Sequence, residues 1–262
     1  MACGNNFINS EIWENCDFSP SSKKIKSIDL LSRFPYESET FDLIYCSHFV
    51  EHVSIDDLNL FFNECNRVLK FGGFIRLVLP DFENIVSEYI KNINEENQLF
   101  SQFNIVELID QCTRKTSGGE LQKWRKFAVE NEVLANYITL RTGLGVPSNI
   151  QRSSKLANKI KNFRFKKLIY KTQRALIYKF LILTPKWFQK NHVIRTETGE
   201  RHLWVHDFES ISVLLSRSRF KKIKKVGPNI SQNLYFPTYP LDVNDNNQPQ
   251  RGTQSMYIEA EK

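Results

Sequence analysis

Residues 48 to 52 read His-Phe-Val-Glu-His, an H-x-x-E-H pattern. Its two imidazoles and one carboxylate are groups that bind zinc. In one class of zinc peptidases this pattern lies on a helix, so that both histidines share one face. Here it follows an apolar run of strand length and precedes a helical pattern, so we expect it on the turn between them. The sequence identifies no third ligand, and we therefore predict no metal site.

The elements around this motif are well marked in the sequence. Residues 41–47 (FDLIYCS) form a continuous apolar run, which is typical of a strand buried on both faces. Residues 54–70 predict an amphipathic helix with Ser54 as its N-cap. We expect the glycines at 72–73 to end that helix, and residues 74–80 (FIRLVLP) to form the next strand.

Polar side chains stand where successive predicted strands end. Two short β-like runs, residues 13–18 and 24–30, come before the motif. The four strand ends carry Asp17, Asp29, Ser47 with His48, and Pro80 with Asp81. Alternating strands and helices predict an α/β fold with a doubly wound, mostly parallel sheet, in which ligands bind beyond the carboxyl ends of the strands. Polar groups at these ends are what a nucleotide-like ligand needs.

The rest of the chain divides into a helical middle and a second α/β part. Helical patterns cover residues 83–93, 102–113 and 124–140. The last sixty residues predict a helix over 206–218, strands over 220–227 and 255–262, and a loop over 237–252. We therefore expect an α/β core of residues 1–83 and 200–262, with residues 84–199 as a helical, basic insertion that covers the ligand site.

The positive charge of the chain is concentrated in one segment. The 262 residues carry a formal net charge of +7, yet no Asp or Glu occurs between Val133 and Thr196. Three interpretations of the basic residues 152–190 stay open. They are a solvated lid, a helix at the membrane surface, and phosphate contacts to nucleic acid, of which the last is the least expected.

Other features favour a reduced, cytoplasmic protein. The five cysteines are odd in number and form no C-x-x-C pair. The first residues have neither the basic start nor the apolar stretch of a signal peptide. No run reaches the about 18 to 20 apolar residues that a spanning helix needs. We expect a cytoplasmic protein, peripheral at the membrane if residues 152–190 lie on its surface.

Residues 27–81 combine an aspartate turn, FD followed by apolar residues, SHFVEH, RVLKFGG and a strand ending in PD. This combination closely resembles the core of class I S-adenosylmethionine-dependent methyltransferases, and more narrowly the type 11-like predicted small-molecule methyltransferases. The tail from His202 to Lys262 resembles the same subgroup. The resemblance covers about residues 2–83 and 200–262. It implies a Rossmann-like sheet of seven strands, the last antiparallel, and S-adenosylmethionine as the cofactor.

The resemblance also implies roles for individual residues. Asp17 would hydrogen-bond the ribose hydroxyls, and Asp29 with Leu30 would flank the adenine. The predicted cofactor site comprises Ala2, Cys3, Gly4, Asn5, Asp17, Phe18, Asp29, Leu30, Ser47 and His48. Residues 2–5 stand for the glycine-rich turn, with Ala2 where a glycine is usual, which a negative φ would allow.

The first strand of the family should run into that turn, and this sequence begins at the turn itself. We expect this strand to be missing because the start of the gene was misassigned or the chain was trimmed. Two neighbouring strands would then have unpaired backbone groups, each costing on the order of 1–3 kcal/mol.

The reaction implied by the resemblance is transfer of the sulfonium methyl group to an oxygen, nitrogen or carbon of a small molecule, a sugar or a lipid-linked glycan, as in polysaccharide biosynthesis. His48 is the candidate general base, or it orders the cofactor loop by hydrogen bonds. Glu51 and His52 are expected to tie that loop to the following helix. Candidate substrate residues are Asp81, His202, Trp204 and His206, with a helix N-cap as the alternative for Asp81. The alternative function is a catalytically inactive adaptor that binds membranes or nucleic acid through the basic insertion.

Overall fold

In the computed structural model the chain is described at residues 1–4, 7–146, 172, 175–177, 179–181, 183–196 and 199–262. Its strands form two sheets. The smaller one pairs β1 (Cys16–Asp17) with β2 (Lys26–Ser27) in parallel. The larger has the order β3-β4-β6-β5, made of β3 (Phe41–Ser47), β4 (Leu69–Pro80), β6 (Ser255–Glu261) and β5 (Lys221–Val226). Strand β6 runs antiparallel to both of its neighbours, as the resemblance implies.

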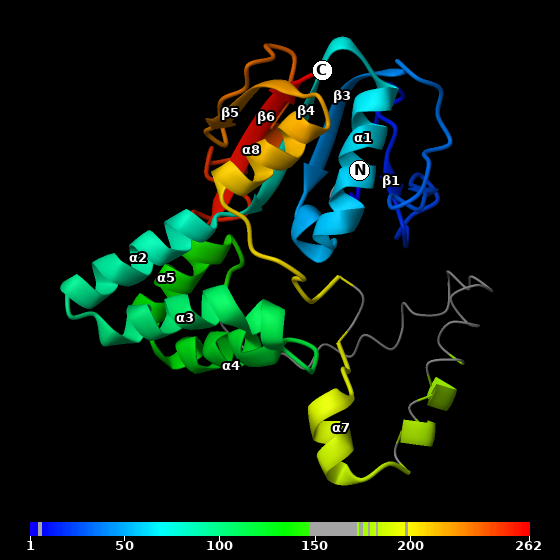
Figure 1. Ribbon diagram of the computed structural model, residues 1–262. Helices are drawn as coiled ribbons and strands as arrows, with labels where there is room; N and C mark the ends of the chain where they lie inside the picture. Colours follow the sequence, from blue (N-terminus) through cyan, green and yellow to red (C-terminus); the bar gives the residue numbers. More distant parts are fainter. Residues whose placement is uncertain (5–6, 147–171, 173–174, 178, 182, 197–198) are drawn as a thin grey trace.

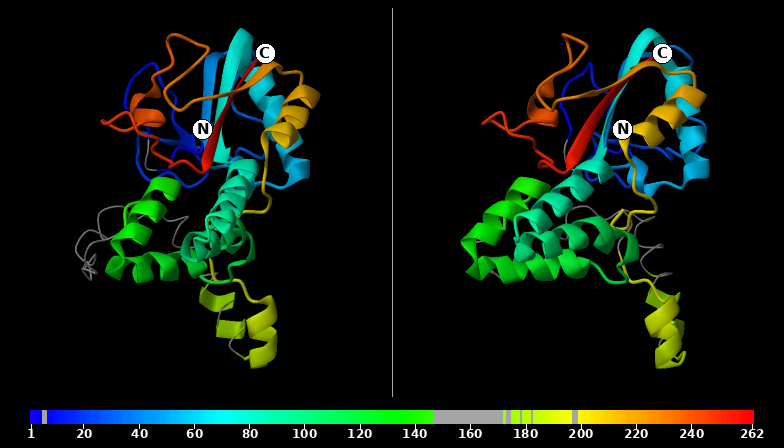
Figure 2. Two further views of the ribbon diagram at one scale, coloured as in Figure 1. Left: turned by 90° about the vertical axis from the view of Figure 1, so that its left-hand side faces the viewer. Right: turned by 60° about the vertical axis from the view of Figure 1, so that its left-hand side comes forward.

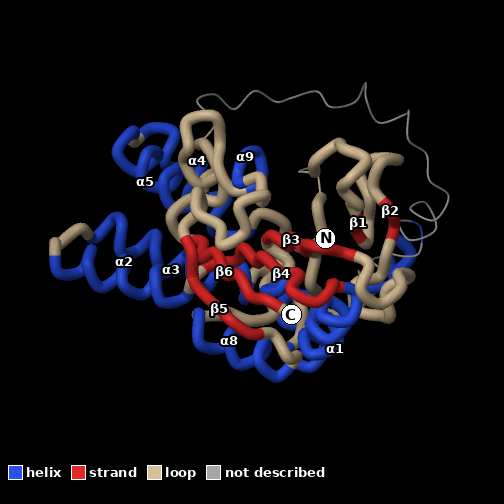
Figure 3. Tube along the Cα trace, turned by 90° about the horizontal axis from the view of Figure 1, so that it is seen from above, coloured by secondary structure: helices blue, strands red, loops and turns tan. Residues whose placement is uncertain are grey.

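Helices cover one face of the larger sheet and a long loop covers the other. Helices α1 (Ile55–Val68) and α8 (Phe208–Arg217) lie side by side on one face (Figures 1 and 3). The loop that contains the short α9 (Thr238–Leu241) packs Phe236 and Leu241 against Phe74 on the opposite face. This three-layer arrangement is the α/β class that the strand and helix pattern predicts.

A group of helices lies beyond the carboxyl ends of β3 and β4 (Figure 2). These are α2 (Phe82–Asn94), α3 (Gln98–Thr113), α4 (Gly119–Phe127) and α5 (Glu132–Thr142), with the short helices η1 (Val50–His52) and η2 (Ala128–Glu130) and the separate α7 (Lys186–His192). Among the described helices, none is long and apolar enough to cross a membrane. Most of residues 152–190 lie outside the described residues, so the three interpretations of that segment stay predictions.

The expected helix over 54–70 forms, but the glycines do not end it. Ser54 accepts a hydrogen bond from the backbone N–H of Asp57, as an N-cap should. The helix ends at Val68, and the next residue is already in the extended β4. A Cβ on Gly73 would lie 2.9 Å from the backbone oxygen of Lys70, so this glycine allows close backbone contact where the β3–β4 register shifts.

Two other expected elements differ in extent. The helix expected over 124–140 is interrupted at Asn131, whose side chain accepts from the N–H of Leu134 and starts α5 anew. The strands expected over 13–18 and 24–30 shrink to two residues each. Strands this short follow from an incomplete ladder, because β1 pairs only with β2 among the described residues.

A gap separates the two sheets where the resemblance places the first strand. The described residues form six strands instead of seven. The first residues of the chain contact both strands that border this gap. The N-terminal amine of Met1 donates to the backbone oxygen of Tyr45 on β3 at 2.6 Å, and the N–H of Cys3 donates to the backbone oxygen of Cys16 on β1 at 3.3 Å. A cavity of about 1160 Å³ lies between β1 and β3, lined by Cys16, Leu43 and Tyr45 among others.

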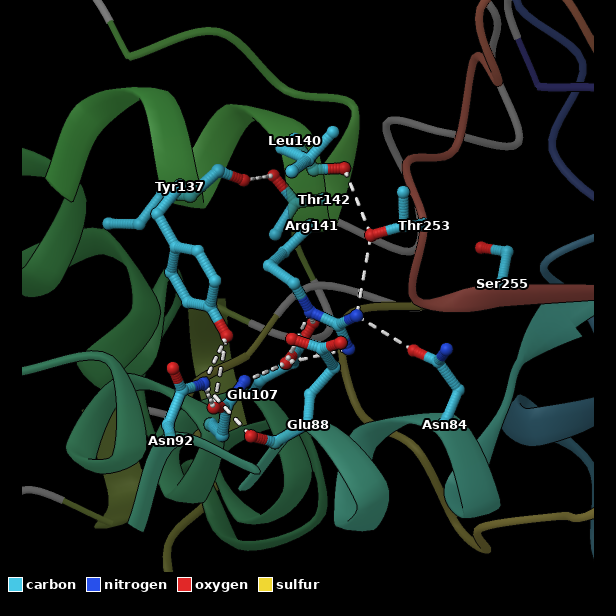
Figure 4. Close-up of polar contacts among 12 residues, drawn as sticks. Asn84, Glu88, Asn92, Glu107, Tyr137, Leu140, Arg141, Thr142, Thr253 and Ser255 are labelled. Carbon is cyan, nitrogen blue, oxygen red and sulfur yellow. Dashed lines mark hydrogen bonds and ion pairs between the residues drawn. The ribbon is translucent and has the colours of Figure 1, made fainter. Parts of the chain in front are cut away.

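Arg141 of α5 joins the helices to the sheet (Figure 4). Its guanidinium, 2% exposed, donates to both carboxylate oxygens of Glu107 on α3 at 3.1–3.2 Å. It also donates to Asn84 of α2 at 2.7 Å and to Thr253, just before β6, at 3.3 Å. One buried cation therefore positions two helices and the start of β6 relative to α5.

We expect Arg141→Met to lower the free energy of unfolding by about 3–5 kcal/mol, because Glu107 would stay buried without its counter-charge. Urea unfolding measures this loss. Lys123→Met, which breaks only the exposed pair with Glu120, is the control and should leave stability unchanged. Equal stabilities for the two variants would contradict the role of Arg141.

Candidate active site

The turn at the start of the chain contacts the first acidic strand end. The N–H of Gly4 donates to one carboxylate oxygen of Asp17 at 2.9 Å, and the N–H of Ser19 donates to the other at 2.7 Å. Each oxygen keeps a lone pair for a further donor. Ala2 has a φ of +48°, so the negative φ that would allow an alanine at this position is not present. The backbone of Ala2 is therefore strained, whereas a glycine would adopt this φ without strain.

The remaining predicted adenine residues divide between surface and core. Phe18, beside Asp17, is 66% exposed, and Asp29 is exposed with one carboxylate oxygen accepting from the N–H of Leu31. The side chain of Leu30 is buried in the core. The ring of Phe18 is therefore accessible to an adenine, whereas the buried side chain of Leu30 is not. Asn5 lies outside the described residues.

His48 occupies a strained position at the end of β3. Its φ of +51° is uncommon for a residue with a side chain, and such residues concentrate at functional sites. Its Nδ1 lies 3.0 Å from Oε1 of Glu51 and its Nε2 lies 3.2 Å from Oγ of Ser255. The hydroxyl of the preceding Ser47 is buried and has no hydrogen-bond partner among the described residues.

Glu51 is a buried carboxylate surrounded by imidazoles. It is 1% exposed, and His48, His52 and His202 all lie within 4.0 Å of Oε1. Burial alone would raise its pKa, but the hydrogen-bonding and charge interactions of these histidines outweigh burial and lower the pKa to about 2. Glu51 is therefore an anion at neutral pH.

The H-x-x-E-H residues form hydrogen bonds with a segment that is distant in the sequence, and not with the helix that follows them. The backbone oxygen of Glu51 accepts from the N–H of Leu203 at 2.7 Å and of Trp204 at 3.3 Å. Nδ1 of His52 lies 2.7 Å from the backbone oxygen of Arg201. The expectation that Glu51 and His52 tie the loop to the next helix is thus wrong, because their contacts reach residues 201–204.

The candidate substrate residues differ in their surroundings. Asp81 caps α2 by accepting from the N–H of Asn84, and it pairs with Lys225 at 2.6 Å. His206 is 2% exposed, and burial lowers its pKa, as it lowers that of His202 to about 4. Trp204 is half exposed. The N-cap alternative for Asp81 is therefore confirmed.

The predicted residues thus gather into two groups. The turn, Asp17 and Phe18 lie by β1, whereas His48, Glu51 and the 202–206 segment lie at the end of β3. Ser255 and Gln111 also reach the second group, since Gln111 Nε2 lies 2.7 Å from His202 Nε2. No sequence signal could identify these two, because each lies far along the chain from its partner.

The first group has the donors and acceptors that S-adenosylmethionine requires. Asp17 retains lone pairs for ribose hydroxyls, Phe18 offers an exposed ring, and Gly4, at φ +54°, has no atom within 4 Å of the place of a Cβ. The orphaned hydroxyl of Ser47 supplies a further polar group at the end of β3. These residues fit a nucleoside cofactor bound at the carboxyl edge.

Comparisons with known proteins indicate which class of protein has such a site. Residues 14–77 match the profile of a family described as "Methyltransferase domain". No curated protein matches the chain. Among solved structures it is similar to a SAM-dependent methyltransferase from Archaeoglobus fulgidus, with 13% identity and a TM-score of 0.35 over 94% of this chain and 74% of that one. The family match, and not this structural likeness, indicates the class of protein.

The matched segment runs from just before β1 into β4 and contains Asp17, Asp29 and Ser47. The sheet order β3-β4-β6-β5 with an antiparallel β6 agrees with the Rossmann-like fold that the resemblance implies. The family match makes this part of the chain a methyltransferase domain, and the cofactor of such a domain is S-adenosylmethionine.

We expect Asp17→Ala to weaken S-adenosylmethionine binding by about 10- to 100-fold, because hydrogen bonds to a charged group contribute about 1.5–3 kcal/mol. Isothermal titration measures the affinity. Asp42→Ala, which removes an exposed aspartate from β3, is the control and should bind like the unaltered chain. Equal affinities for both variants would contradict the placement of the ribose at Asp17.

Proposed function

We propose that the protein transfers the methyl group to a small polar acceptor, namely a sugar hydroxyl of a free or lipid-linked glycan. The observation that carries this proposal is the placement of His48 at the end of β3, with Glu51 3.0 Å from its Nδ1 and Ser255 3.2 Å from its Nε2. A hydroxyl acceptor needs its proton removed during transfer, and an imidazole is suited to remove it near neutral pH.

The environment of His48 supports the role of base. A carboxylate 3.0 Å from Nδ1 favours the tautomer with hydrogen on Nδ1 and leaves the lone pair of Nε2 free to accept a proton. Glu51 is then a positioning residue that orients the imidazole. The single hydroxyl hydrogen of Ser255 can point to Nε2 of His48 or to the backbone oxygen of Arg251 at 3.1 Å, so Nε2 becomes available to an acceptor when that hydrogen points to Arg251. When bound, S-adenosylmethionine supplies an electrophilic methyl group, and the protein contributes alignment and proton removal.

The segment after the helices supports a sugar-like acceptor. Trp204 is 50% exposed, and its backbone N–H donates to the backbone oxygen of Glu51 at 3.3 Å, which places the residue next to the loop that contains His48. An aromatic face presents both apolar surface and a polar edge, which suits the apolar faces of a sugar ring. His202 and His206 lie on the buried side of the same segment.

The alternative function, an inactive adaptor, depends on the basic residues 152–190. Most of that segment lies outside the described residues, and the contacts of His48 and Asp17 favour an enzyme. The peripheral membrane contact and the cytoplasmic location stay predictions. We propose a membrane contact and a cytoplasmic location only because the protein would encounter a lipid-linked acceptor there.

We expect His48→Asn to lower kcat by about 10²- to 10⁴-fold, because asparagine tolerates a positive φ but cannot act as the base. The affinity for S-adenosylmethionine, measured by titration, should not change. His192→Asn on α7 is the control. A loss of cofactor affinity with kcat preserved would instead assign His48 to ordering the loop.

We expect Trp204→Ala to raise KM for the acceptor by about 2- to 10-fold, as loss of one aromatic contact of about 0.5–1.5 kcal/mol would do. Cofactor affinity and kcat should be unchanged. Transfer of labelled methyl groups to a panel of free and lipid-linked sugars supplies the assay, with the exposed Trp187→Ala as the control. If no sugar on the panel accepts a methyl group while the cofactor binds, the acceptor class is wrong.

A further inference from the structure

Glu51, His52 and His202 bring one carboxylate oxygen and two imidazole nitrogens within 4.8 Å of one another. Nε2 of His52 lies 3.9 Å and Nε2 of His202 lies 4.0 Å from Oε1 of Glu51. The two rings meet edge to face with their centroids 4.9 Å apart. One carboxylate and two imidazoles are a ligand set that proteins use for zinc.

The carboxylate of Glu51 has fewer partners than a buried anion ordinarily has. Oε1 has the ring of His48 at 3.0 Å, and Oε2 has no hydrogen-bond partner among the described residues. Buried charges are ordinarily hydrogen-bonded, paired or bound to a metal ion, because desolvation of a lone ion is costly. A cation between Glu51 and the two imidazoles would satisfy this carboxylate.

Neighbouring groups set the tautomers of both imidazoles. The backbone oxygen of Arg201 can only accept, so Nδ1 of His52 carries the hydrogen and Nε2 presents its lone pair on the side of Glu51. This use of the second ring nitrogen is usual at metal sites. The amide nitrogen of Gln111 donates to Nε2 of His202, so that nitrogen carries no hydrogen, and a metal ion would replace the amide as the partner of its lone pair.

Nearby cations are engaged elsewhere and do not occupy this position. Arg114 forms a short ion pair with Asp110, and the guanidinium of Arg201 donates to the backbone oxygen of Cys112 at 3.0 Å. Neither arginine therefore neutralises the charge of Glu51.

We infer that Glu51, His52 and His202 form a binding site for a transition-metal dication of the zinc class. Tetrahedral zinc with bonds of about 2.1 Å holds its ligands about 3.4 Å apart, so each imidazole nitrogen needs to approach Oε1 of Glu51 by about 0.5–0.6 Å and the other imidazole nitrogen by at most about 1.4 Å. The half-buried His52 has room to move, and the amide of Gln111 gives up Nε2 of His202. Two of the ligands come from H-x-x-E-H, but they are its last two residues and not its two histidines.

Such a metal would join the loop after β3 to the segment that returns from the helices. Three protein ligands leave a fourth position for water or an acceptor oxygen, as in zinc sites that are not purely structural. This inference goes beyond the proposed methyl transfer and does not depend on it.

Zinc chloride titrated into the full chain, after dialysis against a chelator, tests the site by calorimetry and by thermal unfolding. We expect one zinc ion per chain and a rise in Tm. His202→Ala and Glu51→Gln should weaken binding by more than about 100-fold, beyond what loss of an outer hydrogen-bond partner costs. His52→Ala, at a half-buried position, provides a variant that keeps the fold if the other two unfold.

Cobalt supplies a second readout, because tetrahedral cobalt absorbs strongly in the visible range. This absorption should appear with the unaltered chain and with the control His192→Ala, whose imidazole lies on α7, and be absent in the ligand variants. The inference is overturned if the unaltered chain binds no zinc, if all three ligand variants keep its affinity, or if His192→Ala loses as much. Titration with S-adenosylmethionine in chelator tests the cofactor site separately, so failure of one does not imply failure of the other.

Discussion

The site at the end of β3 depends on the way Glu51 holds the segment around residue 203. Its backbone oxygen accepts two N–H groups from that segment, and its carboxylate faces three histidines from both sides. The two backbone bonds and the approach of His202 join parts of the chain about 150 residues apart. Without them, His202, Trp204 and His206 would have no fixed relation to His48, and the candidate base would lack its neighbouring carboxylate.

Two buried arginines also join elements that are distant in the sequence. Arg76 in β4 donates to Asp242 and to Glu259 of β6, each at 2.6 Å, and so joins the end of α9 to the last strand. Arg141 does this for the helices and the start of β6. Charges this deeply buried need their partners, so each network makes one packing arrangement strongly preferred over others.

Local signals in the sequence predicted the core elements well. The apolar run of β3 and the Ser54 cap of α1 appear where expected, because periodicity and capping act over a few residues. The antiparallel direction of β6 was expected from the family resemblance alone. Gly73 was assigned to the wrong element. Its purpose is close backbone contact within the sheet, which depends on the neighbouring strand. Ala2 likewise has a positive φ, which its sequence position could not indicate.

The sequence by itself determined the class of the fold and the identity of the residues at the strand ends, since both depend on short-range patterns. It placed H-x-x-E-H on a turn after a strand, and the structure agrees. The expectation that this strand is buried on both faces is wrong, because only Ile44 and Cys46 of β3 are buried. Only the tertiary structure decided what that motif contacts. Chain topology brings His202, Gln111 and Ser255 to it from three distant elements, and no spacing rule relates residues that meet only after the chain has folded.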